Sequence, residues 1–337
     1  MRVMAGKPAP PGGVTNNFAK IAGRCTLRVM NRRDFLRRAA LLTATGWLAR
    51  FPLSAQTAAS APAAVLGTFH PLRRGVGYFS GRGGTIGWLA DAAALAVVDT
   101  QFPDTAAFCL GGLPGREGRR IDVVINTHHH RDHTAGNGVF RPVAGKIVAQ
   151  ANVPELQLAA AARSGNESEQ VLADETFAEF WRRDLGDEVV TAQYLGAAHT
   201  NGDAIVHFER ANVVHLGDLV FNRLYPVIDR PAGASIRHWI TVLEEAVAYY
   251  PKDAIYLFGH GKPDFGVTGG QGDLLVFRDY LAGLLAHVER GIAAGKSRAE
   301  IVGLANLPGF DDFHAPAPNR LAGNLGTAYD ELTAERG

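Results

Sequence analysis

A run of histidines directly after an apolar stretch constrains the fold of this chain more than any other feature. Residues 121–125, Ile-Asp-Val-Val-Ile, are rich in β-branched side chains and predict a buried strand. Residues 126–137 follow as Asn-Thr-His-His-His-Arg-Asp-His-Thr-Ala-Gly-Asn, and their final Gly-Asn pair indicates a loop. Imidazoles and a carboxylate at the end of a strand form a ligand set that suits a borderline cation such as zinc.

The spacing within this motif sorts its side chains. Alternation along an extended segment sends His128 and His130 to one side and His129 to the other. Asp132 and His133 can turn back as the chain curls, and they offer an oxygen and a nitrogen to a second ion. A solvated histidine-rich loop is the alternative interpretation, but the complete His-x-His-x-Asp-His pattern after a hydrophobic strand favours a metal site.

This motif resembles that of the metallo-β-lactamase superfamily, and the similarity extends over about residues 65–265. The resemblance implies an α/β (α+β) fold, a four-layer αββα sandwich, with further metal ligands at three later strand ends. The chain has a candidate for each of them: His199, Asp218 and His260. Asp99, at the end of an earlier strand, is expected to orient a histidine or simply to cap its strand.

The ligand count divides the candidates between two divalent ions, taken as zinc, with iron or manganese as alternatives. The first ion is expected to bind His128, His130 and His199, and the second Asp132, His133 and His260, with Asp218 bridging the two. Such a pair lowers the pKa of a shared water, and the resulting bridging hydroxide attacks an electrophilic centre. Asp132 is the candidate catalytic residue, because its carboxylate can also orient the nucleophile.

The substrate class rests on the resemblance. Family members that open β-lactams usually carry Cys or Ser where this chain has Asp218, whereas thioester, lactone and phosphodiester hydrolases carry Asp. We therefore expect a hydrolase of a small-molecule ester, thioester or lactone, similar to glyoxalase II or a lactonase, with β-lactam hydrolysis as the alternative. An oxidoreductase similar to the mononuclear iron persulfide dioxygenases, and a metal-binding protein without catalysis, remain open.

The N-terminal residues resemble a twin-arginine export signal. Residues 31–38, Asn-Arg-Arg-Asp-Phe-Leu-Arg-Arg, precede a modest apolar stretch over 39–49 that is too short to span a membrane. We expect a signal over 30–61 that engages the twin-arginine translocation machinery, with cleavage after Ala55, no stable membrane anchor afterwards, and a periplasmic or secreted protein. Residues 1–29 are expected to be disordered, or untranslated if Met30 is the start.

Composition limits the partners and the redox chemistry. Lys and Arg number 34 against 33 Asp and Glu, so no excess of positive charge indicates a nucleic-acid partner. After cleavage Cys109 would be the single cysteine, which excludes an intramolecular disulfide. We expect Cys109 to be a buried apolar group in a helix.

The pattern of apolar residues predicts the remaining organisation. Residues 62–270 form the sandwich domain and 271–337 a C-terminal helical extension. Helices are expected at 102–110, 153–162, 177–185, 235–250, 274–292, 297–304 and 319–333, and a β-turn at the glycine cluster 81–84. Asn222, Arg223, Tyr225 and His238 are weaker candidates for the rim of the site, whereas His129, His207 and His215 are expected to face away from the ligands and His287 and His314 to bind no metal.

Overall fold

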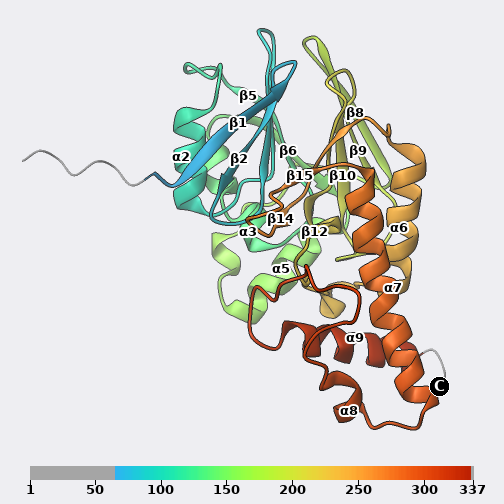
Figure 1. The fold of residues 1–337 in the computed structure, drawn as a ribbon. Helices are drawn as coiled ribbons and strands as arrows, with labels where there is room; N and C mark the ends of the chain where they lie inside the picture. Colours follow the sequence, from blue (N-terminus) through green and yellow to red (C-terminus); the bar gives the residue numbers. More distant parts are fainter. Residues whose placement is uncertain (1–64, 335–337) are drawn as a thin grey trace, which may run out of the picture. The chain divides into compact units, whose positions relative to one another are not determined.

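Two β-sheets lie face to face between layers of helices in the computed structural model, which describes residues 65–334 (Figure 1). The predicted signal and the segment before it lie outside the described residues. The first sheet has the order β1 (Gly67–Arg73), β2 (Val76–Gly81), β3 (Ile86–Ala90), β4 (Leu95–Val98), β5 (Ile121–Asn126), β6 (Ala144–Gln150) and β7 (Glu175–Phe177). The second has the order β15 (Thr268–Gly269), β13 (Ile255–Leu257), β11 (Val213–His215), β10 (Ala204–Phe208), β9 (Glu188–Tyr194) and β8 (Phe180–Leu185). A small parallel pair joins β12 (Phe221–Asn222) to β14 (His260–Gly261).

Helices cover the outer faces of both sheets, as predicted for an αββα sandwich. The α-helices are α2 (Pro103–Gly112), α3 (Arg131–Thr134), α4 (Asn137–Phe140), α5 (Val153–Ser164), α6 (Ile236–Tyr249), α7 (Gln271–Ala293), α8 (Arg298–Val302) and α9 (Arg320–Ala334). Short 3₁₀ turns occur at Glu167–Glu169, Gly217–Leu219 and Arg230–Ala232. Within residues 65–334, no helix has both the length and the apolar character needed to cross a membrane.

Strand alternation separates the cores of the sandwich. In β4, Leu95 and Val97 pack with the helices on the outer face of the first sheet, while Ala96 and Val98 belong to the core between the two sheets. A third core lies on the outer face of the second sheet and includes residues of α6, α7 and α9. Cys109 is fully buried on the inner face of α2, which confirms its predicted role as a small apolar group in a helix.

Parallel pairing of the central strands places the histidine motif. β4, β5 and β6 run parallel, so their carboxyl ends meet at one edge of the first sheet. Asp99 directly follows β4, and its backbone N–H donates to Ile125 of β5. The motif after β5 therefore begins beside Asp99.

The predicted helix at 177–185 is wrong. This segment forms the end of β7 and all of β8, and β8 pairs with β9 from Phe180 opposite Gln193 to Leu185 opposite Glu188. Phe180 and Trp181 are residue types that favour strands. Gly186, with φ of 62°, lies in the turn between the two strands. Pairing with β9 thus decides the conformation of a segment whose polar pattern also fits a helix.

The helix starts predicted in the C-terminal half are found. The Ser235 hydroxyl accepts from the His238 N–H at the start of α6. Ser297 and Glu300 form a reciprocal capping box at α8. Helix α7 begins at Gln271, next to the domain boundary proposed at residue 270, which stays a prediction.

Candidate metal centre

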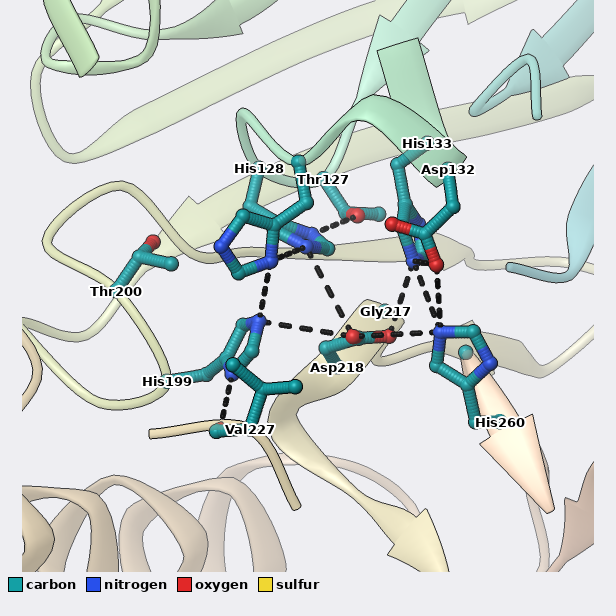
Figure 2. A network of polar contacts seen from close by, with 12 residues as sticks. Thr127, His128, Asp132, His133, His199, Thr200, Gly217, Asp218, Val227 and His260 are labelled. Carbon is teal, nitrogen blue, oxygen red and sulfur yellow. Dashed lines mark hydrogen bonds and ion pairs between the residues drawn. The ribbon is translucent and has the colours of Figure 1, made fainter. Parts of the chain in front are cut away.

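Four separate parts of the chain bring the seven predicted ligands together, all of which except His130 are labelled in Figure 2. The motif after β5 supplies four of them, the loop between β9 and β10 supplies His199, the turn after β11 supplies Asp218, and β14 begins with His260. The side chains form one group of His128, His130, His199 and Asp218 and a second of Asp132, His133 and His260. These are the two sets that the sequence analysis expected, and a third group, which it did not expect, joins His129 to His130 and Asp229.

Three ring nitrogens of the first group point at one another. His128 Nε2 lies 3.1 Å from His130 Nδ1, and His199 Nε2 lies 2.9 Å from the same atom. Nitrogens bound tetrahedrally to one zinc ion at the usual bond length are about 3.3 Å apart. The spacing in this group is therefore close to that of ligands around one ion.

The opposite ring nitrogens of these histidines face hydrogen-bond acceptors. His199 Nδ1 is 2.9 Å from the Val227 carbonyl, and His130 Nε2 is 2.9 Å from Asp229 Oδ2. When those outer nitrogens carry the protons, the inner nitrogens present lone pairs to one another. A cation between them satisfies all of these lone pairs, so the residues fit a metal ion.

Asp99 and Thr127 orient the other two buried histidines. Thr127 donates its single hydroxyl hydrogen to Asp99 Oδ2 at 2.7 Å, so the same hydroxyl accepts from His128 Nδ1 at 3.0 Å. Asp99 Oδ2 also lies 2.8 Å from His133 Nδ1. These contacts assign the proton of each ring to its outer nitrogen and agree with the orienting role expected for Asp99.

The second group has more carboxylate character. His260 Nε2 lies 3.0 Å from Asp132 Oδ2, and His133 Nε2 lies 3.1 Å from Asp218 Oδ1. The other oxygen of Asp218 is 3.5 Å from both His199 Nε2 and His260 Nε2. Asp218 therefore stands between the groups: Oδ1 faces His133 of the second group, and Oδ2 lies between His199 of the first and His260 of the second.

Burial and charge set the protonation of the site. Burial lowers the pKa of His199 to about 3, and burial likewise holds the pKa of His128 well below its ordinary value. Burial alone would raise the pKa of Asp218, but the charges of His260 and His133 hold it well below normal. Burial alone would also lower the pKa of His260, yet Asp218 and Asp132 raise it to about 9. The second group thus has a negative field that attracts positive charge.

Close backbone approach requires glycine around these ligands. Gly217, before Asp218, has φ of 50°, and a side chain there would meet Thr127. A Cβ at Gly259 would meet the Asp218 carboxylate, and one at Gly84 would meet the His133 ring. The glycine cluster predicted as a turn therefore packs directly against the histidine motif.

Asp229 contacts the candidate ligands, and the sequence analysis did not single it out. Its carboxylate contacts His130 and lies 3.5 Å from His129 Nε2, and its backbone N–H donates to the His199 carbonyl at 3.3 Å. Asp229 follows β12 in an irregular segment, where no strand pattern marks it. An Asp preceding Arg-Pro at a short 3₁₀ turn is the only local signal.

The four weaker rim candidates do not contact the ligand atoms. Tyr225 is buried against Tyr280 and Phe313, and the Asn222 amide donates to the Gly266 carbonyl. The other two also have structural partners: Arg223 pairs with Asp273 at 3.4 Å, and His238 Nδ1 lies 2.9 Å from the Ala197 carbonyl.

The histidines expected to face away from the ligands differ in their surroundings. His129 lies outside the group of His128 and His130, as alternation predicts, but it is buried beside Asp229 rather than removed from the site. His207 packs edge-on against Tyr250. His215 is buried, with Nε2 3.0 Å from the Thr85 carbonyl.

The four-layer sandwich carries, at one edge of its strands, histidines and aspartates that could hold metal ions. The sequence model of the metallo-beta-lactamase superfamily matches residues 81–260, more than half of the chain. The chain belongs to the metallo-beta-lactamase superfamily.

Solved structures agree on the fold. A metallo-beta-lactamase from Pontibacter korlensis matches with a TM-score of 0.53 and 18% identity, covering 64% of this chain and 99% of that one. A metallo beta lactamase from Hirschia baltica matches with a TM-score of 0.51 and 18% identity, covering 64% and 97%. A double mutant of the sec-alkyl sulfatase PisA1 matches with a TM-score of 0.62 and 15% identity, covering 79% of this chain and 50% of that one.

The placement of His129 generates a prediction. His129→Ala should retain the metal, because the ring is outside both groups of predicted ligands and belongs only to the third group with His130 and Asp229. The variant should nevertheless lose about 1–3 kcal/mol of unfolding free energy because the ring is buried. Metal content by elemental analysis and denaturant unfolding of the metal-free protein measure the two effects. His128→Ala is the control that should lose metal, and an equal loss in His129→Ala would show that His129 is itself a ligand.

Proposed function

We propose that this chain is a dinuclear metal-dependent hydrolase that cleaves an ester, thioester or lactone bond. The observation that carries the proposal is the orientation of the imidazoles. Their outer nitrogens face Thr127, Asp229, Val227 and Asp99, while their inner nitrogens converge around the buried carboxylate of Asp218. One Asp218 oxygen, Oδ1, is buried without an aligned hydrogen bond, which fits a ligand atom.

We assign the seven proposed ligands to two metal ions, with zinc as the proposed metal. His128, His130 and His199 would hold the first, Asp132, His133 and His260 the second, and Asp218 would contact both. When bound, such ions acidify a shared water and polarise the oxygen of the bond under attack. Nitrogen and carboxylate ligands without cysteine favour such a reactive site over a closed structural zinc site.

Asp132 is proposed to orient the attacking water. Burial alone would raise the pKa of Asp132, but His133 and His260 lower it to about 2, so the carboxylate is a hydrogen-bond acceptor at neutral pH. Its side chain is 30% exposed, in contrast to the 3% of Asp218. Asp132 can therefore accept a hydrogen bond from a water molecule that also reaches the substrate.

The exposed members of the site define the side from which a substrate approaches. His130 and His260 expose 20% and 24% of their side chains, whereas those of His133 and His199 are fully buried. His130 and His260 therefore form the accessible edge of the site together with Asp132. A substrate carbonyl placed there would meet both ligand groups at once.

The identity of residue 218 supports the bond class. Its carboxylate lies between the two groups, and Asp at this position is shared with the thioester and lactone hydrolases of the family, whereas β-lactam-cleaving members usually carry Cys or Ser. One structural neighbour is a sec-alkyl sulfatase, so sulfate esters are included among the bonds to be tested.

A substrate panel tests the proposal. Protein loaded separately with zinc, iron or manganese should hydrolyse a chromogenic ester, thioester or lactone faster than an alkyl sulfate or a cephalosporin. Sulfide-dependent oxygen uptake by the iron-loaded protein would instead assign it to the persulfide dioxygenases. Full metal loading with no turnover of any compound would leave a metal-binding protein without catalysis.

Removing the shared carboxylate provides a second test. Asp218→Ala should reduce the metal content below two ions per chain. It should also slow hydrolysis by more than about 100-fold, because losing an outer partner of a metal ligand already costs up to about that factor and Asp218 is proposed as a ligand itself. Asp184→Ala is the matched control, because that carboxylate is 70% exposed on β8. Unchanged metal content and rate in Asp218→Ala would contradict the bridging assignment.

Export through the twin-arginine pathway is also proposed, on the basis of residues 31–49 alone. That pathway carries folded proteins, so the metal can be acquired before crossing. N-terminal sequencing of the periplasmic protein should find Gln56 as the first residue, and replacing Arg32 and Arg33 by lysine should retain the precursor in the cytoplasm. Export that persists in this double variant would refute the assignment.

A further inference from the structure

The C-terminal helix α9 carries a buried carboxylate that contacts the segment beside the metal centre. The Glu331 side chain is 5% exposed, and it accepts hydrogen bonds from four donors. Its partners are Arg230 Nη1 at 3.2 Å, Ser235 Oγ at 3.2 Å, Ile236 N at 3.0 Å and Arg237 N at 3.1 Å. The two backbone donors belong to the first turn of α6, so Glu331 caps that helix from outside.

The segment that Glu331 contacts also orients ligands of the first group. The Val227 carbonyl accepts from His199, and the Asp229 carboxylate accepts from His130. The Ser235 backbone N–H donates to the Ala198 carbonyl at 3.1 Å, directly before His199. Residues 227–235 therefore connect Glu331 to two of the three histidines of the first group.

Arg230 links Glu331 to the turn that follows Asp229. Its guanidinium donates both to the Ala234 carbonyl, at 2.7 Å, and to Glu331. Asp229 precedes Arg230, and its carbonyl accepts from the backbone N–H groups of Ala232 and Ala234. The turn that presents the Asp229 carboxylate to His130 is thus fixed on its far side by the carboxylate of Glu331.

Helix α9 is itself held firmly. Leu325 and Leu332 of α9 lie in the apolar core that also contains Trp239 of α6. The Trp239 ring packs against the His199 ring, with 5.6 Å between the ring centroids. Glu331 is therefore a fixed point relative to this wall of the site.

We propose that Glu331 is a positioning residue for the first metal, acting through residues 227–235 on His130 and His199. The proposal rests on the function proposed above, because it presumes that these histidines bind an ion. Among residues 65–334, no comparable contact of Glu331 reaches the second group, in which Asp99 orients His133 through its outer nitrogen. The effect of changing Glu331 should therefore be confined to one of the two ions.

The experiment measures zinc affinity by chelator competition in two backgrounds. His260→Ala leaves the first group intact, and His199→Ala leaves the second. Glu331→Gln places an amide N–H₂ group among hydrogen-bond donors. We therefore expect it to weaken zinc binding about tenfold in the His260→Ala background, which is the lower end of the loss measured for outer partners of metal ligands. In the His199→Ala background the loss should be less than about twofold. Cobalt absorption spectra of the first background should change as well.

Asp330→Asn is the matched control. Asp330 lies on the same helix, but its carboxylate pairs with Arg298 of α8 at 3.1 Å and does not contact residues 227–235. It should leave both affinities unchanged. Equal weakening by Asp330→Asn, or equal weakening of both ions by Glu331→Gln, would show a general loss of stability and overturn the proposal.

The outcomes separate this inference from the proposed function. Wild-type protein that binds no zinc would refute the function, whereas two tightly bound ions in both wild type and Glu331→Gln would refute only the role of Glu331. If Glu331→Gln fails to fold, Arg230→Gln removes one of the four contacts. Arg230→Gln should then weaken binding of the first ion by less than the about tenfold expected of Glu331→Gln, and an unchanged affinity would overturn the proposal.

Discussion

The hydrogen bonds on the outer nitrogens of the histidines are the interaction on which the candidate metal centre depends. An imidazole has one proton and one lone pair when neutral, so an acceptor at one nitrogen turns the lone pair of the other toward its neighbours. Thr127, Val227, Asp99 and Asp229 are the acceptors. They come from the ends of β4 and β5 and from the segment after β12. The sandwich thus fixes the direction of each ligand as well as its position.

The parallel strands explain why these groups can be so close. Asp99 follows β4, the histidine motif follows β5, and the two strands are hydrogen-bonded neighbours. A short reach from each strand end is enough to bring the Asp99 carboxylate to His133 and to Thr127. Long flexible side chains are not needed, and the ordering of the site costs correspondingly little side-chain entropy.

Much of this arrangement could be predicted from the sequence because it is encoded locally. The β-branched strand before the motif, the alternation of His128 and His130, and the Ser-based helix caps depend on neighbouring residues. Asp229 and Glu331 could not be predicted in the same way, since each acts on groups distant along the chain and neither belongs to a recognisable motif. The segment 177–185 was assigned wrongly for a similar reason, because pairing with β9 outweighs its local pattern.

Four of the seven ligand candidates lie within six residues, from His128 to His133, while the other three are spread as far as His260. The denatured chain therefore keeps a compact set of imidazoles and a carboxylate that can chelate metal without any fold. Binding to the unfolded ensemble offsets part of what the native protein gains by binding. Added zinc should thus raise the melting temperature less than the affinity of the native protein for zinc alone would give. Metal that binds the unfolded chain can also remain bound while the chain folds.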